Sequence, residues 1–185
     1  MAALLVSCGA PKASPDEVTD AALHALQTMD PNELDQYWNR SEPSPISKKV
    51  KDQLQKPESQ KTLAFLSKNL TYQILSSQED GDSAQVTATI TNINMAEVLS
   101  VFLQDSIETA LHASLAGEPP PTYEGFSQQY RNRLIEILEQ GEFEPKTTTV
   151  EIHLALIDRE WVIQPDEPLL NALTGGLLTT AEQLS

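Results

Sequence analysis

The residue with the clearest potential chemistry is Cys8, the only cysteine of the chain, which lies in the run 4–9 (LLVSCG). An apolar run, a small residue and a cysteine form the pattern of a bacterial lipobox, in which the cysteine becomes the lipidated first residue. A secretory signal has a charged start and an apolar stretch of about 7–15 residues, whereas only the seven uncharged residues 1–7 precede Cys8. We therefore expect the natural start to lie upstream of Met1, or the chain to be trimmed there. Residues 1–13 are then a signal remnant and a tether. The alternative is a lone thiol near a frayed terminus.

A second possible chemistry lies in the last third of the chain, where Glu151 and His153 alternate with Val150, Ile152 and Leu154. A period of two places Glu151 and His153 on the same face of a strand. An imidazole, which titrates near neutrality, beside a carboxylate is the best acid–base pair that the sequence offers. If the sheet is cupped, this face lines a cleft. The residues that we assign to that candidate cleft are Glu151, His153, Trp161 and Tyr72. The competing interpretation is a solvated pair of polar neighbours, with the tryptophan as a core anchor.

Other catalytic and ligand-binding patterns are missing from the sequence. The three histidines fall in different expected elements, and none has a histidine or cysteine at metal-ligand spacing. There is no phosphate-binding glycine loop, dinucleotide fingerprint or nucleophile elbow. The acidic segment 79–82 has too few ligands for a calcium loop, and Gly175-Gly176 is expected to bend the chain. The sequence therefore predicts no metal, no cofactor and no catalytic residue.

The composition fits one domain with a mainly aliphatic core. The chain has 185 residues, of which 39% are hydrophobic and 5% aromatic, and this length suits a single domain. No segment approaches the roughly 20 apolar residues that span a bilayer, so we expect a lipid on Cys8 to be the only membrane link. The net charge of −15 argues against nucleic acid, which is bound by clustered Lys and Arg, and against docking on anionic lipid. Solubility explains this charge; the alternatives are a basic partner or loose cation binding.

Helical signals dominate the first third of the chain and return in its middle. The segments 14–17 (SPDE) and 30–33 (DPNE) each read as a helix start with a proline at the first helical position. Segment 41–45 is a break, and 46–70 is helical in parts, with Pro57 between two short helices. Two longer helices are expected at about 95–116 and 123–140, with a proline-rich break between them.

Two β-hairpins enclose these longer helices. Strands are expected at 72–75 and 85–91, and alternation of Thr with apolar residues in the second is typical of a half-buried antiparallel strand. Strands at 149–156 and 160–163, joined by a tight turn at Asp158-Arg159, form the second hairpin. A broken helical tail follows at 169–184. We predict an α+β domain over residues 14–185, a curved antiparallel sheet packed on the N-terminal helices. Residues 95–140 form an inserted helical hairpin.

The order of these elements and two sequence phrases resemble a known group of proteins. The phrases are the closing hairpin 150–163 (VEIHL to DREWVI) and the stretch 87–95 (TATITNINM) before the long helix. They resemble small lipoproteins of Gram-positive gut bacteria whose domain is NTF2-like or cystatin-like, over roughly residues 16–178. The resemblance implies a cone-shaped α+β fold and an extracytoplasmic protein anchored to the cell membrane by lipid. It does not imply a reaction.

Three functions are compatible with these patterns. The leading hypothesis is a non-enzymatic surface lipoprotein that binds a peptide, an envelope partner or a small molecule. The helical hairpin 95–140 is its expected interaction element, because it adds surface beyond what the sheet needs for closure. The alternative is a small acid–base enzyme of the ketosteroid-isomerase or dehydratase type, which requires an enclosed cavity holding His153 or a buried carboxylate. The third hypothesis is a structural envelope protein without a ligand.

Overall fold

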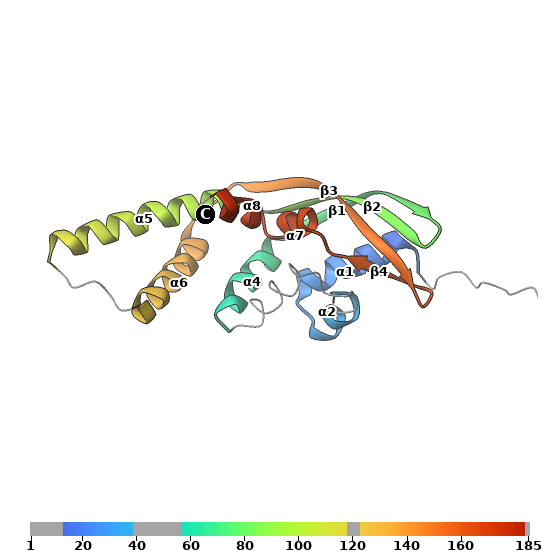
Figure 1. The fold of residues 1–185 in the computed structure, drawn as a ribbon, viewed down its shortest axis with the longest axis horizontal. Helices are drawn as coiled ribbons and strands as arrows, with labels where there is room; N and C mark the ends of the chain where they lie inside the picture. Colours follow the sequence, from blue (N-terminus) through green and yellow to red (C-terminus); the bar gives the residue numbers. More distant parts are fainter. Residues whose placement is uncertain (1–12, 39–56, 118–122, 184–185) are drawn as a thin grey trace, which may run out of the picture.

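The computed structural model describes residues 13–38, 57–117 and 123–183 and shows an α+β protein (Figure 1). One antiparallel sheet has the strand order β1-β2-β3-β4. Its strands are β1 (Thr71–Asp80), β2 (Ser83–Ile93), β3 (Pro145–Ile157) and β4 (Glu160–Gln164). The helices are α1 (Pro15–Thr28), α2 (Pro31–Trp38), α4 (Pro57–Asn69), α5 (Met95–Leu115), α6 (Tyr123–Gln140), α7 (Glu167–Leu173) and α8 (Leu177–Gln183). The α+β class that the sequence predicts is confirmed.

Two β-hairpins make up the sheet, as predicted. Gly81 and Asp82 join β1 to β2. The turn that the sequence predicts at 79–82 therefore comprises only these two residues, and residues 79 and 80 belong to β1. Asp158 and Arg159 join β3 to β4 with φ angles of 51° and 68°, the left-handed conformation that two-residue hairpin turns require. β2 pairs with β3 along its whole length. The chain between β2 and β3 carries α5 and α6, so the prediction of a helical hairpin inserted between the β-hairpins is confirmed.

Helices cover one face of the sheet, and the core lies beneath them. Figure 1 shows α1, α2, α4 and α7 on the same side of the strands, and each contacts at least one of the strands. Leu23 of α1 and Leu169 of α7 are completely buried there. Between the buried positions of β2, the threonines are only partly buried on the opposite face, as their alternation predicts. The core side chains that β2 and β3 supply are Val86, Ala88, Ile90, Val150, Ile152 and Leu154.

The two predicted helix starts near the N-terminus are confirmed. The Ser14 N–H donates to the Glu17 carboxylate at 2.9 Å, and the Asp30 carboxylate accepts a hydrogen bond of 2.8 Å from the N–H of Asn32. The indole N–H of Trp38 donates to the Ala22 carbonyl oxygen at 2.8 Å, which ties α2 to α1. The predicted break at 41–45 and the segment 46–56 lie outside the described residues, and Pro57 begins α4.

A buried junction joins the end of β2 to the C-terminal helices at the point where α5 begins. Asn92 is 1% exposed; its amide donates to the Leu173 carbonyl at 2.8 Å and accepts from the Ile93 N–H at 2.8 Å. The Met95 N–H donates to the Gly175 carbonyl at 3.0 Å. Gly175 has a φ of +62°, and a Cβ there would lie 1.9 Å from the Ile93 carbonyl oxygen. The predicted bend at Gly175 is thus a close backbone contact that fixes the base of α5.

Candidate functional site

The predicted lipidation site and tether lie mostly outside the described residues. Cys8 falls in the segment 1–12, and Ala13, two residues before the start of α1, is the first described residue. Within the described ranges, no helix is long and apolar enough to cross a membrane.

The Glu151–His153 pair lies on the open face of β3, as its alternation predicts. Both residues are exposed; in the pairing register, Glu151 lies opposite Thr87 and His153 opposite Gln85 and Gln164. The His153 side chain is 52% exposed, and its Nε2 is 3.8 Å from the Asp166 carboxylate. The pair therefore lies on a solvated surface, whereas the acid–base hypothesis requires an enclosed cavity.

The two aromatic members of the candidate cleft lie on the other face of the sheet. Tyr72 pairs with the buried Ile90, and its hydroxyl is 3.0 Å from both the backbone carbonyl and the carboxylate of Asp20. Burial and the hydrogen bond to Asp20 raise the pKa of Tyr72 to about 12. Trp161 is 5% exposed and belongs to the main core. The prediction of one cleft lined by all four residues is wrong, because the sheet itself separates the two pairs.

A small hollow adjoins Trp161 on the helix side of β4. It encloses about 190 Å³ between α1, α2 and β4, with Val18, Tyr37 and Val162 among its walls. Within the described part of the chain, the indole nitrogen of Trp161 has no hydrogen-bond partner. That nitrogen has almost no solvent-accessible surface, so it does not offer a free donor to the hollow. Trp161 is a core anchor, as the competing sequence interpretation proposed.

The feature that departs most from a compact domain is the pair α5 and α6, here called the arm. Figure 1 shows the arm projecting beyond the sheet, at the opposite end of the molecule from the start of α1. Its base is a second apolar cluster, separate from the main core, which Phe65, Phe102, Leu134, Phe143 and Leu177 surround. The buried members of that cluster are Leu66, Ile93, Met95, Val98, Ile137 and Leu138.

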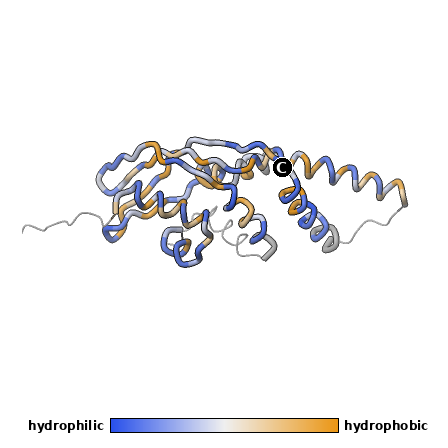
Figure 2. Tube along the Cα trace, turned by 180° about the vertical axis from the view of Figure 1, so that it is seen from behind, coloured by the Kyte–Doolittle hydropathy of each residue, from blue (hydrophilic) through white to orange (hydrophobic). Residues whose placement is uncertain are grey.

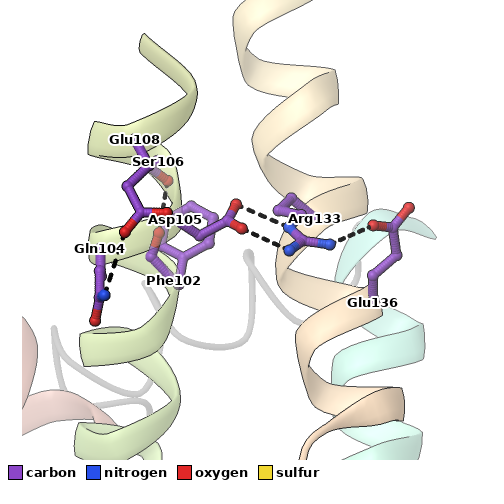
Figure 3. A network of polar contacts seen from close by, with 7 residues as sticks. All are labelled: Phe102, Gln104, Asp105, Ser106, Glu108, Arg133 and Glu136. Atoms are coloured by element: carbon purple, nitrogen blue, oxygen red, sulfur yellow. Dashed lines mark hydrogen bonds and ion pairs between the residues drawn. The ribbon is translucent and has the colours of Figure 1, made fainter. Parts of the chain in front are cut away.

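Two contacts beyond the base hold α6 against α5. The rings of Phe102 and Tyr130 meet edge to face, with centroids 5.5 Å apart, a favourable geometry for aromatic pairs. Next to them, the Arg133 guanidinium donates two hydrogen bonds to the Asp105 carboxylate, one of them 2.8 Å long (Figure 3). It donates a third of 3.0 Å to Glu136. These hydrogen bonds lower the pKa of Asp105 and raise the pKa of Arg133. A planar two-bond pair adds geometric specificity to this contact between the two helices.

A polar cleft of about 570 Å³ lies between the two helices around this ion pair. Ser106 and Thr109 of α5 face Gln129 and Asn132 of α6 across it. Its charged groups are the already paired Asp105, Arg133 and Glu136. Among the described residues, no three His, Cys, Asp or Glu side chains are grouped so that they could hold a metal ion.

The other side of α5 carries a row of exposed aliphatic side chains, here called the α5 stripe: Leu103, Ile107, Leu111 and Leu115. Residues four apart advance by about 40° around a helix, so these four lie along one side. Leu103, at the base end of the row, is 38% exposed, whereas Ile107, Leu111 and Leu115 are 68%, 57% and 77% exposed. Phe102, which contacts α6, is about 140° away from Ile107 around the helix. Figure 2 shows the hydrophobic residues of α5 recurring along the projecting helix.

The sequence analysis predicted the long helix but not the exposure of these four side chains. A signal for their exposure was present, because the helix has two apolar series at i, i+4 spacing that are offset by one residue. One series contains Val98 and Phe102, and the other continues from Leu103 to Leu115. A helix that packs against a single neighbour buries one such series. No sequence signal pointed to the Arg133–Asp105 pair.

Comparisons with known proteins add information about the fold alone. The fold is similar to the crystal structure of a protein described as a putative lipoprotein (ycdA) from Bacillus subtilis subsp. subtilis str. 168, with a TM-score of 0.56 and 18% sequence identity. The match covers 88% of this chain and 55% of that chain, so this chain spans about half the length of the Bacillus protein. No protein-family model matches the sequence, and no curated protein matches it.

Proposed function

We propose that this protein is a lipid-anchored surface protein of a Gram-positive bacterium whose domain is a non-enzymatic interaction module. The lipobox-like context of Cys8 supports the anchor, and the description of the structurally similar Bacillus protein as a lipoprotein is consistent with it. The domain itself is of the NTF2-like or cystatin-like kind, an assignment supported by an antiparallel sheet with helices over one face. The arm is the element that binds the partner.

The observation that carries this function is the α5 stripe. Burying a whole Leu or Ile side chain contributes about 1.5–3 kcal/mol, and Ile107, Leu111 and Leu115 are each more than half exposed. Covering the three therefore makes available about 1–2 kcal/mol per side chain. An exposed row of aliphatic side chains at i, i+4 spacing is the pattern of a helix that docks into a groove.

The position of the arm in the molecule is compatible with anchoring through the N-terminal tether. Figure 1 shows the start of α1, which follows the tether, at one end of the molecule and the tip of α5 at the other. A protein held to a membrane through Cys8 would then present the α5 stripe on the side away from its anchor. The stripe is thus available to a partner outside the membrane.

Site-specific photocrosslinking tests the interaction function. The full chain, expressed in a Gram-positive host, would carry a photoreactive phenylalanine derivative at position 107, or at position 101 as the matched control. Val101 is also exposed on α5 but lies about 120° away from Ile107 around the helix. We expect adducts from position 107 and few from position 101. Equal yields at the two positions, or none at either, would contradict the proposal and favour a structural envelope protein.

The anchor is tested separately by the intact mass of the N-terminal peptide after expression from the native upstream region. We expect a diacylglyceryl mass on Cys8 that is absent from the Cys8→Ala variant. An unmodified chain that begins at Met1 would refute the anchor but leave the arm proposal standing.

A further inference from the structure

We infer that the partner of the α5 stripe is a protein with an apolar groove bordered by Lys or Arg side chains. This inference rests on the proposed function and names the chemistry of the partner. It starts from the charges of the binding helix. α5 carries Glu97, Asp105 and Glu108 and contains no Lys or Arg. The imidazole of His112, in its last turn, is its only basic side chain.

The three acids of α5 have different surroundings. Asp105 is paired with Arg133, and the Glu97 carboxylate accepts the N–H of Glu144 at 3.2 Å, at the base of the arm. Glu108 is exposed and accepts a hydrogen bond of 3.3 Å from the neutral amide of Gln104. Glu108 follows Ile107 in the sequence and precedes Leu111 by three residues, so it borders the α5 stripe. Glu108 is therefore the acid of α5 that is both exposed and next to the α5 stripe.

The overall charge points to the same kind of partner. The chain has 27 acidic and 12 basic residues, a net charge of −15. A second copy would bring the same acidic helix and the same net charge to the contact, and an anionic membrane surface would repel the arm. A groove with an apolar floor would bury the aliphatic side chains of the α5 stripe, and a basic rim would pair with the Glu108 carboxylate. Charge at the rim mainly raises the association rate and selects the partner, whereas the aliphatic row provides the buried area.

Charge reversal at Glu108 tests this inference in the photocrosslinking format. The probe is the full chain with the photoreactive residue at position 107, incubated with solubilised cell envelope at low and high salt. Glu108→Lys is compared with Glu79→Lys, which changes the net charge equally but lies on β1 at an exposed position of the sheet. We expect Glu108→Lys to lower the adduct yield at least about threefold, and Glu79→Lys to change it little. High salt should lower the yield of the parent chain and have less effect on Glu108→Lys.

Mass spectrometry of the crosslinked peptides completes the test. A crosslinked segment that contains apolar residues together with Lys or Arg, and a yield that depends on Glu108, support the inference. An adduct of two copies of this chain, a lipid adduct, or a yield that is unchanged by Glu108→Lys would overturn the partner chemistry while the interaction function stands. A failure of the function itself looks different, because position 107 then gives no more adduct than position 101.

Discussion

The separation of the arm into a packed base and an exposed stripe predicts a large loss of stability for one alanine substitution and almost none for another. Leu138 is 2% exposed in the base cluster beside Met95 and Val98, and truncating a buried leucine to alanine costs about 2–5 kcal/mol. Ile107 is 68% exposed, so Ile107→Ala removes few contacts. Alanine is also the better helix former, and we expect a change in the free energy of unfolding within about 0.5 kcal/mol.

For a domain of this size, 1 kcal/mol corresponds to roughly 2–4 °C in Tm. With about 3 kcal/mol for Leu138→Ala, its Tm should fall by about 6–12 °C, while the Tm of Ile107→Ala stays within about 2 °C.

Urea and thermal unfolding, followed by two probes, would measure both variants. Trp161 belongs to the main core and Trp38 packs against it, so their fluorescence reports the sheet and its covering helices. Far-ultraviolet circular dichroism also reports α5 and α6. If the arm unfolds by itself in Leu138→Ala, the dichroism transition moves and the fluorescence transition does not.

A loss of stability in Ile107→Ala as large as that in Leu138→Ala would refute the reasoning, because it would mean that the α5 stripe is buried in the free protein. No loss in Leu138→Ala would equally refute the packed base.

Three further predictions concern the body of the domain. Asn92→Leu removes a buried hydrogen bond to the Ile93 N–H and a part-buried one to the Leu173 carbonyl, so we expect urea unfolding to show a loss of about 2–4 kcal/mol. Gly175→Ala should cost about 3 kcal/mol, because its Cβ would overlap a backbone carbonyl at positive φ. Gly81→Ala, which also has positive φ but no atom within 4 Å, should lose only about 1 kcal/mol in the same assay. Because folding raises the pKa of Tyr72 above its ordinary value of 10.0, the un-ionised phenol contributes its full stabilisation below pH 10.0. This contribution is lost as the pH rises through the folded-state pKa of about 12. Phenolate absorbance against pH should show a late step that Tyr72→Phe abolishes, and a step already complete near pH 10 would disprove the contact with Asp20.

Much of the fold could be predicted because its signals are local. The helix start at 14–17 depends on a proline and on a carboxylate that reaches back three residues. The alternation in β2 assigns its threonines to the open face whatever the neighbouring strands do. Asp158-Arg159 forms a two-residue turn, and the face shared by Glu151 and His153 follows from the period of a single strand.

The predicted cleft failed because it depended on long-range relations. Whether Tyr72 shares a face with His153 depends on the register between β1, β2 and β3, and nothing within one strand encodes that register. The observed pairing places Tyr72 opposite Ile90 and His153 opposite Gln85, on different faces of the same sheet. Trp161 follows the same rule, because it pairs with Leu156 on the covered face.

The sequence by itself determined the class of the fold, the order of its elements, the inserted helical hairpin and the acidic character of the chain. These properties follow from periodicity, capping and composition, which act over a few residues or over the whole chain. Only the tertiary structure decided which apolar series of α5 is buried. Phe102 packs against Tyr130 and Asp105 pairs with Arg133, and these contacts between distant segments fix the side of α5 that faces α6. The same contacts leave the side of α5 that carries Ile107 exposed to solvent, where it is available to the proposed partner.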